Sequence, residues 1–231
     1  MIDVLKNHPF FAHKQIESYQ LLQNQGHCNE NYLLVADGVK YIVRKLLRDD
    51  IDRAFEWKVH ALVYEQGLTA KPLVFDSQNS FMVFAFLEGE HKSTLGEDAL
   101  KLLAHTVQKL HSIKIDGKPI TLKIEYKSEV VLQAFETIEN ASKEYVLCHN
   151  DLNPQNIFFS NEVKLIDFEY AGVNDSYFDL ASVCVEFKLE GELEALFLET
   201  YFEGKGFSVV KLDAYKIIYK RLWEEWFENN S

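Results

Sequence analysis

The sequence predicts an α+β fold in two parts, a strand-rich first part followed by a mainly α-helical second part. Short segments rich in β-branched and aromatic residues occupy the chain up to residue 87, and this composition favours strands. From Leu95 onward, apolar residues recur at the spacing of amphipathic helices. With 231 residues, of which 47% are hydrophobic, the chain can bury the core of one large domain or of two small lobes.

The first part is expected to be a five-stranded antiparallel sheet with one helix. Asp37 and Gly38 supply a two-residue turn, so the segments on either side should pair as a hairpin. Apolar residues share one face of a helix expected over residues 49–66, which Gly67 can end. The strands are expected at residues 19–22, 32–36, 39–46, 73–75 and 81–87.

The second part is expected to be built from helices, interrupted by short strands around one polar loop. One of these strands covers residues 163–166. The helices are expected at residues 98–112, 128–141, 178–189, 193–202 and 210–227.

The most informative segment runs from residue 146 to residue 172, VLCHNDLNPQNIFFSNEVKLIDFEYAG. His149, Asp151 and Asn156 form the pattern HxDxxxxN, and Asp167 follows an apolar strand. This arrangement is typical of a kinase catalytic loop and its metal-binding aspartate. Either fragment alone is common in ordinary turns, but both in this order indicate an enzyme that transfers phosphate from ATP.

The residue types suit this chemistry, because phosphoryl transfer needs a positioned hydroxyl and a neutralised triphosphate. Asp151 can accept the hydroxyl proton as the catalytic base. Asn156 and Asp167 offer oxygen ligands to Mg²⁺, and the absence of a thiolate from this set argues against zinc. His149 is a second candidate catalytic residue, although a role in bracing the loop is favoured over that of base.

Composition restricts the function classes. A net charge of -12 disfavours nucleic acid as a partner and would attract a cationic substrate. Cys28, Cys148 and Cys184 form no CxxC pair, which fits packing residues in a reducing compartment. The chain has no hydrophobic run of membrane-spanning length, and its start, MIDVLKNHPFF, lacks the features of a signal peptide. We therefore expect a cytoplasmic protein without membrane insertion.

The motifs resemble those of the choline and ethanolamine kinases, within the aminoglycoside-phosphotransferase-like branch of the protein-kinase fold. The resemblance covers most of the chain and is most specific in three segments, CHNDLNPQNIFF (148–159), LIDFEYAG (165–172) and FDLA (178–181). Together they look like the bacterial choline kinases. The resemblance implies a two-lobed protein-kinase-like fold, with a nucleotide-binding lobe at residues 1–86 and a catalytic and acceptor-binding lobe at residues 87–231.

The resemblance also implies an ATP site. The loop GHCNENYLL (26–34) would place Asn29 over the phosphates, although it is not a GxGxxG loop. In YIVRK (41–45), Arg44 stands where protein kinases use Lys, and Glu56 would be its ionic partner. Arg44 or Lys45 could instead cap a solvent-facing strand, and Lys45 is the weaker candidate. Residues 84–89 would be the hinge that meets the adenine.

The acceptor side decides the substrate, because a fold does not name one. A quaternary ammonium group needs aromatic faces and nearby carboxylates. Trp223 and Trp226 match the WxxW pair that lines the choline pocket in the family, and Glu186 lies near its acidic position. Other small-molecule kinases typically carry a Trp in the IDxE segment, which ends at Glu169 in this sequence. Glu169 and the adjacent Tyr170 are further candidates for substrate binding. Alternatively, the tryptophans pack in the core and Glu186 is a surface residue.

The sequence therefore predicts an ATP- and Mg²⁺-dependent kinase that phosphorylates a small amino alcohol, with choline first. Ethanolamine, thiamine, an aminoglycoside or a sugar are the alternative acceptors. A catalytically silent kinase-like binding module is a third possibility, which the complete Asp151, Asn156 and Asp167 set argues against. Family members usually continue past WxxW into another aromatic segment, whereas this sequence ends at WFENNS, so the expected cage is incomplete, more open or devoted to a different amine.

Overall fold

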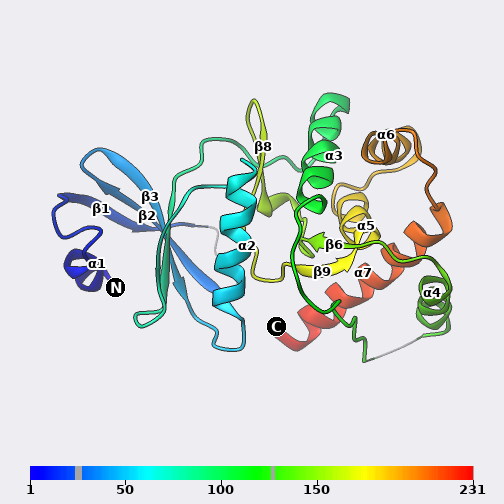
Figure 1. Cartoon of the computed structure of the whole chain (residues 1–231), viewed down its shortest axis with the longest axis horizontal. Helices are drawn as coiled ribbons and strands as arrows, with labels where there is room; N and C mark the ends of the chain where they lie inside the picture. Colours follow the sequence, from blue (N-terminus) through cyan, green and yellow to red (C-terminus); the bar gives the residue numbers. More distant parts are fainter. Residues whose placement is uncertain (24–27, 126–127, 231) are drawn as a thin grey trace. The chain divides into compact units, whose positions relative to one another are not determined.

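The structure is a computed structural model that describes residues 1–23, 28–125 and 128–230. The chain forms two compact units, Met1–Glu88 (unit 1) and Gly89–Ser231 (unit 2). Unit 1 contains the large sheet and α2, whereas unit 2 is mainly helical (Figure 1). The α+β class predicted from the sequence is confirmed.

Unit 1 is a five-stranded antiparallel sheet in the order β1-β2-β3-β5-β4. The helix α2 (Arg53–Glu65) follows the third strand, as predicted. The strands are β1 (Ile16–Leu21), β2 (Asn29–Ala36), β3 (Val39–Leu46), β4 (Pro72–Asp76) and β5 (Phe81–Ala85).

The hairpin of β2 and β3 forms at the predicted turn. Ala36 pairs with Val39, and the two residues between them, Asp37 and Gly38, both have positive φ, at 50° and 71°. A two-residue turn with positive φ at both positions matches the twist of the flanking strands. The hairpin places Arg44 opposite Asn31 in the sheet.

Two helices of unit 1 differ from the sequence-based expectation. The helix α2 begins at Arg53 and not at residue 49, because the Asp52 side chain accepts a hydrogen bond from the Phe55 backbone N–H (3.0 Å) and caps it there. A short N-terminal helix, α1 (Ile2–Asn7), was not predicted. Its Leu5 is fully buried in the core on one face of the sheet, so tertiary packing and not length supports it.

Unit 2 packs its helices in pairs: α4 and α5 both pack against α7, and α3 packs against α6. In Figure 1, α7 is the long red helix beside α4 and α5. The helices are α3 (Glu97–His111), α4 (Glu129–Asn140), α5 (Ser176–Glu186), α6 (Gly191–Phe202) and α7 (Val209–Asn230). Each overlaps one of the helices expected from the sequence.

Two small antiparallel sheets carry the polar loop of unit 2. In one, β6 (Tyr145–Cys148) pairs with β9 (Gly172–Asp175); β9 was not predicted. In the other, β7 (Ile157–Phe159) pairs with β8 (Val163–Leu165). The loop that contains Asp151 therefore leaves one sheet and enters the other through the short 3₁₀ turn Pro154–Asn156.

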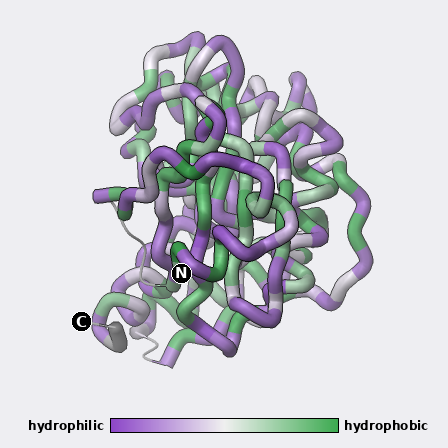
Figure 2. The backbone as a smooth tube through the Cα atoms, turned by 90° about the vertical axis from the view of Figure 1, so that its left-hand side faces the viewer, coloured by the Kyte–Doolittle hydropathy of each residue, from purple (hydrophilic) through white to green (hydrophobic). Residues whose placement is uncertain are grey.

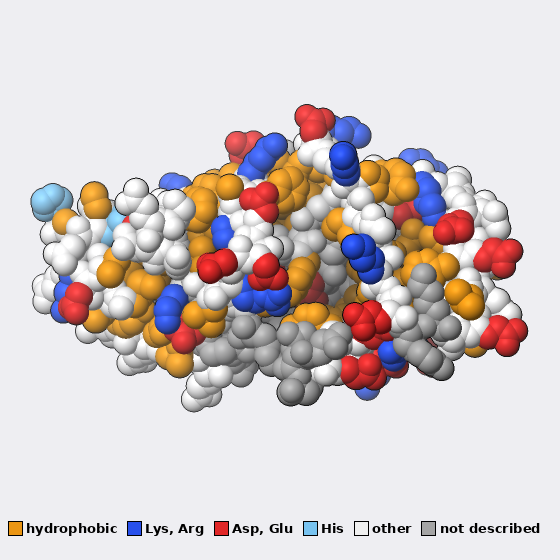
Figure 3. Space-filling model, turned by 90° about the horizontal axis from the view of Figure 1, so that it is seen from below, with side chains coloured by type: hydrophobic (Ala, Val, Ile, Leu, Met, Phe, Trp, Pro, Cys, Tyr) orange, Lys and Arg blue, Asp and Glu red, His pale blue; other side chains and the backbone are white. Residues whose placement is uncertain are grey.

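Within the described residues, no helix is long and apolar enough to cross a membrane. Hydrophobic and hydrophilic residues alternate in short segments along the chain (Figure 2). On the face shown in Figure 3, acidic side chains are interspersed with basic ones.

Candidate active site

The Asp151 carboxylate is held in one orientation by two amide side chains. Asn153 Nδ2 donates to Asp151 Oδ1 (2.9 Å), and Asn156 Nδ2 donates to Asp151 Oδ2 (2.8 Å). Asn156 Nδ2 also donates to the Asp151 backbone carbonyl (2.9 Å), so its amide oxygen faces away from Asp151. The 3₁₀ turn Pro154–Asn156 fixes Asn156, and the Asn153 side chain caps this turn by accepting from Gln155 N–H (2.8 Å).

Burial raises the pKa of Asp151 above its ordinary value, and the nearby Asp167 charge contributes in the same direction. The neighbouring His149 and the amide hydrogen bonds partly oppose this shift in the pKa. A carboxylate with a raised pKa is a better proton acceptor, which suits a general base.

Asp167 is brought to the same place by hydrogen bonds of the residue before it. Ile166 N–H donates to the Asn156 carbonyl (3.0 Å), and His149 Nε2 donates to the Ile166 carbonyl (2.9 Å). Asp167 itself has a φ of 68°, in the left-handed region, where Asp is tolerated better than bulky residues. The turn re-aims the chain directly after β8, and backbone strain of this kind clusters at functional sites.

The donor set fits a hard cation. Asn156 contributes an amide oxygen and Asp167 a carboxylate, whose charge interacts with that of Asp151. These are the ligand types of Mg²⁺.

His149 is fully buried, at 0% exposure, and stacks at an angle on Phe168 with ring centroids 4.9 Å apart. Its contact with the Ile166 carbonyl joins the two parts of the motif. This placement supports the bracing role for His149 and gives it no access to a substrate hydroxyl.

Asp179 on α5 holds the loop that contains Asp151 in place through hydrogen bonds. It was not among the predicted site residues. Its carboxylate accepts from His149 N–H (2.7 Å), Asn150 N–H (2.8 Å) and the His111 ring (3.0 Å). His111 in turn contacts the Tyr201 hydroxyl (2.7 Å). The sequence did contain a signal for this role, because Asp179 is the one acidic residue in the mainly apolar run FDLASVCV. An acid that is fully buried needs hydrogen-bond donors as partners.

The predicted acceptor residues of unit 2 partly come together. The Trp223 and Trp226 rings meet edge to face, with centroids 5.7 Å apart, at the C-terminal end of α7. Glu186 is half-buried and accepts a hydrogen bond from the Tyr219 hydroxyl (3.0 Å), and the Tyr219 ring meets Trp223 at 6.2 Å. Tyr219 was not predicted, although its place one helical turn before Trp223 puts it on the same face.

Glu169 and Tyr170 lie directly after Asp167 and Phe168. The Tyr170 carbonyl accepts from the Asn150 side chain (2.9 Å), which ties this segment to the catalytic loop, and its side chain is exposed. Their role in substrate binding stays a prediction.

In unit 1, Arg44 and Glu56 form a buried ion pair, with Arg44 Nη1 at 3.0 Å from Glu56 Oε1. Arg53 was not predicted and binds the other oxygen of Glu56 (2.7 Å). Arg53 also donates to the Asn29 side chain (2.9 Å), so one network joins α2, β3 and the start of β2. Gly26 and His27 of the predicted phosphate loop lie outside the described residues. Lys45 pairs instead with Glu30 (2.9 Å) near the surface.

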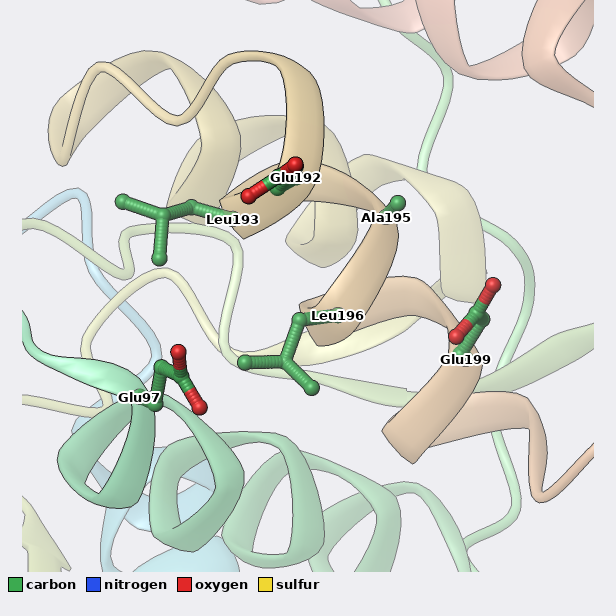
Figure 4. Close-up of a pocket in the computed structure, with 6 residues that line it drawn as sticks. All are labelled: Glu97, Glu192, Leu193, Ala195, Leu196 and Glu199. Atoms are coloured by element: carbon green, nitrogen blue, oxygen red, sulfur yellow. The ribbon is translucent and has the colours of Figure 1, made fainter.

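A separate hollow of about 370 Å³ lies between α3 and α6 (Figure 4). Its lining residues are Glu97, Glu192, Leu193, Ala195, Leu196 and Glu199. None of them belongs to the motifs, and exposed carboxylates alone do not make a site.

Comparisons with known proteins bear on the same residues. Residues 121–216, which include the catalytic loop, match the model of the phosphotransferase enzyme family. The chain is 27% identical over 202 residues to Protein LicA of Haemophilus influenzae, a match that covers 75% of this chain and 76% of LicA.

Two solved structures share the fold. The choline kinase LicA from Streptococcus pneumoniae superposes with a TM-score of 0.83 and 23% identity, over 98% of this chain and 89% of that one. A choline/ethanolamine kinase family protein from Mesorhizobium loti gives a TM-score of 0.78 and 19% identity, over 97% and 83%. The predicted protein-kinase-like fold and the predicted resemblance are thereby confirmed: the chain is similar to choline and ethanolamine kinases and to the phosphotransferase enzyme family.

Proposed function

We propose that this protein is a kinase that transfers the terminal phosphoryl group of ATP to the hydroxyl of choline, with Mg²⁺ as its metal ion. One observation carries the proposal most directly. Asp151 is fixed by Asn153 and Asn156 and shares its surroundings with Asp167, so a base and a set of oxygen ligands for a metal stand together. The kinase relatives support the use of ATP and of a small-molecule alcohol.

In this proposal, Asp151 accepts the proton of the substrate hydroxyl while the hydroxyl oxygen attacks the terminal phosphorus. The bond between that phosphorus and the bridging oxygen breaks, and ADP leaves. Asn156 and Asp167 hold the metal, which when bound neutralises charge on the triphosphate. His149 and Asp179 keep the loop in place and do not touch the substrate.

On the nucleotide side, we assign the phosphates to Arg44, positioned by Glu56, and to Asn29. A guanidinium can bind phosphate oxygens through two parallel hydrogen bonds. The ion pair with Glu56 fixes the direction of the Arg44 side chain. Unit 1 is accordingly the proposed nucleotide-binding lobe, and unit 2 the catalytic and acceptor-binding lobe.

On the acceptor side, we assign the cation to Glu186 and to the rings of Trp223 and Trp226, with Glu169 and Tyr170 beside them. Choline has no N–H to donate, so aromatic faces and a carboxylate are its available partners. The half-buried position of Glu186 makes its charge more effective than that of a fully exposed residue.

The test is a screen for ADP release with choline, ethanolamine, thiamine, an aminoglycoside and a hexose as acceptors, at fixed ATP and Mg²⁺. Asp151→Asn serves as the blank for ATP hydrolysis. We expect choline to give the highest kcat/KM and Asp151→Asn to remove the activity. A clear preference for another acceptor would replace the substrate assignment, and no ADP release above the Asp151→Asn blank with any acceptor would argue for a silent module.

A further inference from the structure

Tyr219 on α7 connects the Glu186 carboxylate to the aromatic end of the helix. It is among the most buried side chains of unit 2, at 1% exposure. Its ring packs edge to face on Phe178 from α5 (5.8 Å, 71°) and on Trp223 one turn later in α7 (6.2 Å, 70°). Contacts on both sides hold the ring, so the position of its hydroxyl is fixed by packing.

That hydroxyl donates to Glu186 Oε1 (3.0 Å). Among the described residues, this is the one hydrogen bond found for the Glu186 carboxylate. A long, flexible side chain that is half-buried loses much of its freedom through such a bond. Tyr219 therefore selects one orientation of Glu186.

Glu186 also lies within electrostatic range of the proposed base. Burial raises the pKa of Glu186, and the Asp151 charge raises it further, whereas the Tyr219 hydrogen bond lowers it. Tyr219 thus favours the ionised form of a carboxylate that its surroundings disfavour.

We infer that Tyr219 is a positioning residue for cationic acceptors, whose hydroxyl orients Glu186 toward the ammonium group. The inference rests on the proposed function and deepens it, because it assigns the preference for a charged acceptor to a pair of residues from α5 and α7. Tyr219 acts through Glu186 and takes no part in the phosphoryl transfer.

The substitution that isolates this role is Tyr219→Phe. It removes the hydroxyl and keeps the ring that packs on Phe178 and Trp223. The matched control is Tyr215→Phe, which alters another buried tyrosine one turn earlier in α7. Both variants should melt cooperatively before they are compared.

The assay compares choline with its uncharged carbon isostere, 3,3-dimethylbutan-1-ol, at saturating ATP. For Tyr219→Phe we expect the KM for choline to rise roughly tenfold or more, as for the loss of one hydrogen bond to a charged group. The kcat for choline, the KM for ATP and the KM for the isostere should stay within about twofold of wild type, since each is independent of the Glu186 charge. Tyr215→Phe should keep the wild-type ratio of the two acceptors.

A double-mutant cycle with Glu186→Gln tests whether Tyr219 acts through Glu186. If it does, Tyr219→Phe combined with Glu186→Gln should discriminate the two acceptors no worse than Glu186→Gln alone. The inference is overturned if Tyr219→Phe keeps the wild-type ratio, if it raises both KM values equally, or if its effect simply adds to that of Glu186→Gln. A wild-type enzyme that prefers neither choline nor another cationic alcohol overturns the proposed substrate itself, and the wild-type measurements alone reveal that outcome.

Discussion

Replacing Asp179 by Asn should loosen the catalytic loop without touching any group that meets a substrate. Asp179 Oδ2 accepts from His149 N–H and from the His111 ring, and Oδ1 accepts from Asn150 N–H. Asparagine has a single oxygen, so its NH₂ group must face a donor at one of these two positions. At least one backbone N–H is then left unsatisfied in a fully buried place.

The expected cost follows from these contacts. A hydrogen bond to a charged acceptor contributes about 1.5 to 3 kcal/mol, and an unsatisfied buried donor costs about 1 to 3 kcal/mol. Because the two overlap, we expect local stability to fall by about 2 to 4 kcal/mol. Asp151 follows Asn150 directly, and a displaced catalytic group loses rate steeply, so turnover should fall about tenfold or more.

Hydrogen exchange followed by mass spectrometry can measure this locally, since two compact units need not unfold in one step. The peptide that contains His149 and Asn150 should exchange faster in Asp179→Asn, while peptides of unit 1 stay unchanged. Asp98→Asn is the matched control, because Asp98 and Asp179 both lie in the first turn of a helix. Equal exchange in the two variants would refute the bracing role of Asp179.

Three further predictions concern the proposed site. Asp151→Asn should lower turnover at least about a hundredfold. Because burial raises the pKa of Asp151, its contribution to stability is full below the unfolded pKa and is lost as the pH rises through the folded one. The Tm of Asp151→Asn relative to wild type should therefore be higher at neutral pH than at acid pH, and the opposite trend would contradict this. Arg44→Gln should raise the KM for ATP and leave the KM for choline nearly unchanged. Lys45→Gln should change neither KM value. The reverse result in steady-state kinetics would move the phosphate-binding role to Lys45. Trp223→Leu should raise the KM for choline more than Trp223→Phe does, by up to about thirtyfold, because only Phe keeps a π face, and equal values would assign Trp223 to packing.

Local patterns in the sequence determined much of the fold. The two-residue turn at Asp37 and Gly38 and the β-branched and aromatic content on either side predicted the bounds of β3 correctly. The spacing of the motif predicted that Asp151, Asn156 and Asp167 act together, and the structure places Asn156 in contact with Asp151, whose pKa the Asp167 charge raises. Both signals are short-range: a turn needs particular backbone angles at adjacent residues, and a loop that binds a metal and a hydroxyl needs its oxygens at short chain distance.

Tertiary structure decided the parts that depend on contacts between distant segments. Asp179 reaches back about thirty residues to the catalytic loop, and Tyr219 meets Glu186 across two helices, 33 residues apart in sequence. Arg53 joins Glu56 to Asn29. Helical periodicity predicts the face of the helix on which each of these residues lies. It does not predict which neighbouring element that face contacts. That choice is made by packing of the whole unit, and it turns a recognisable motif into a site with fixed geometry.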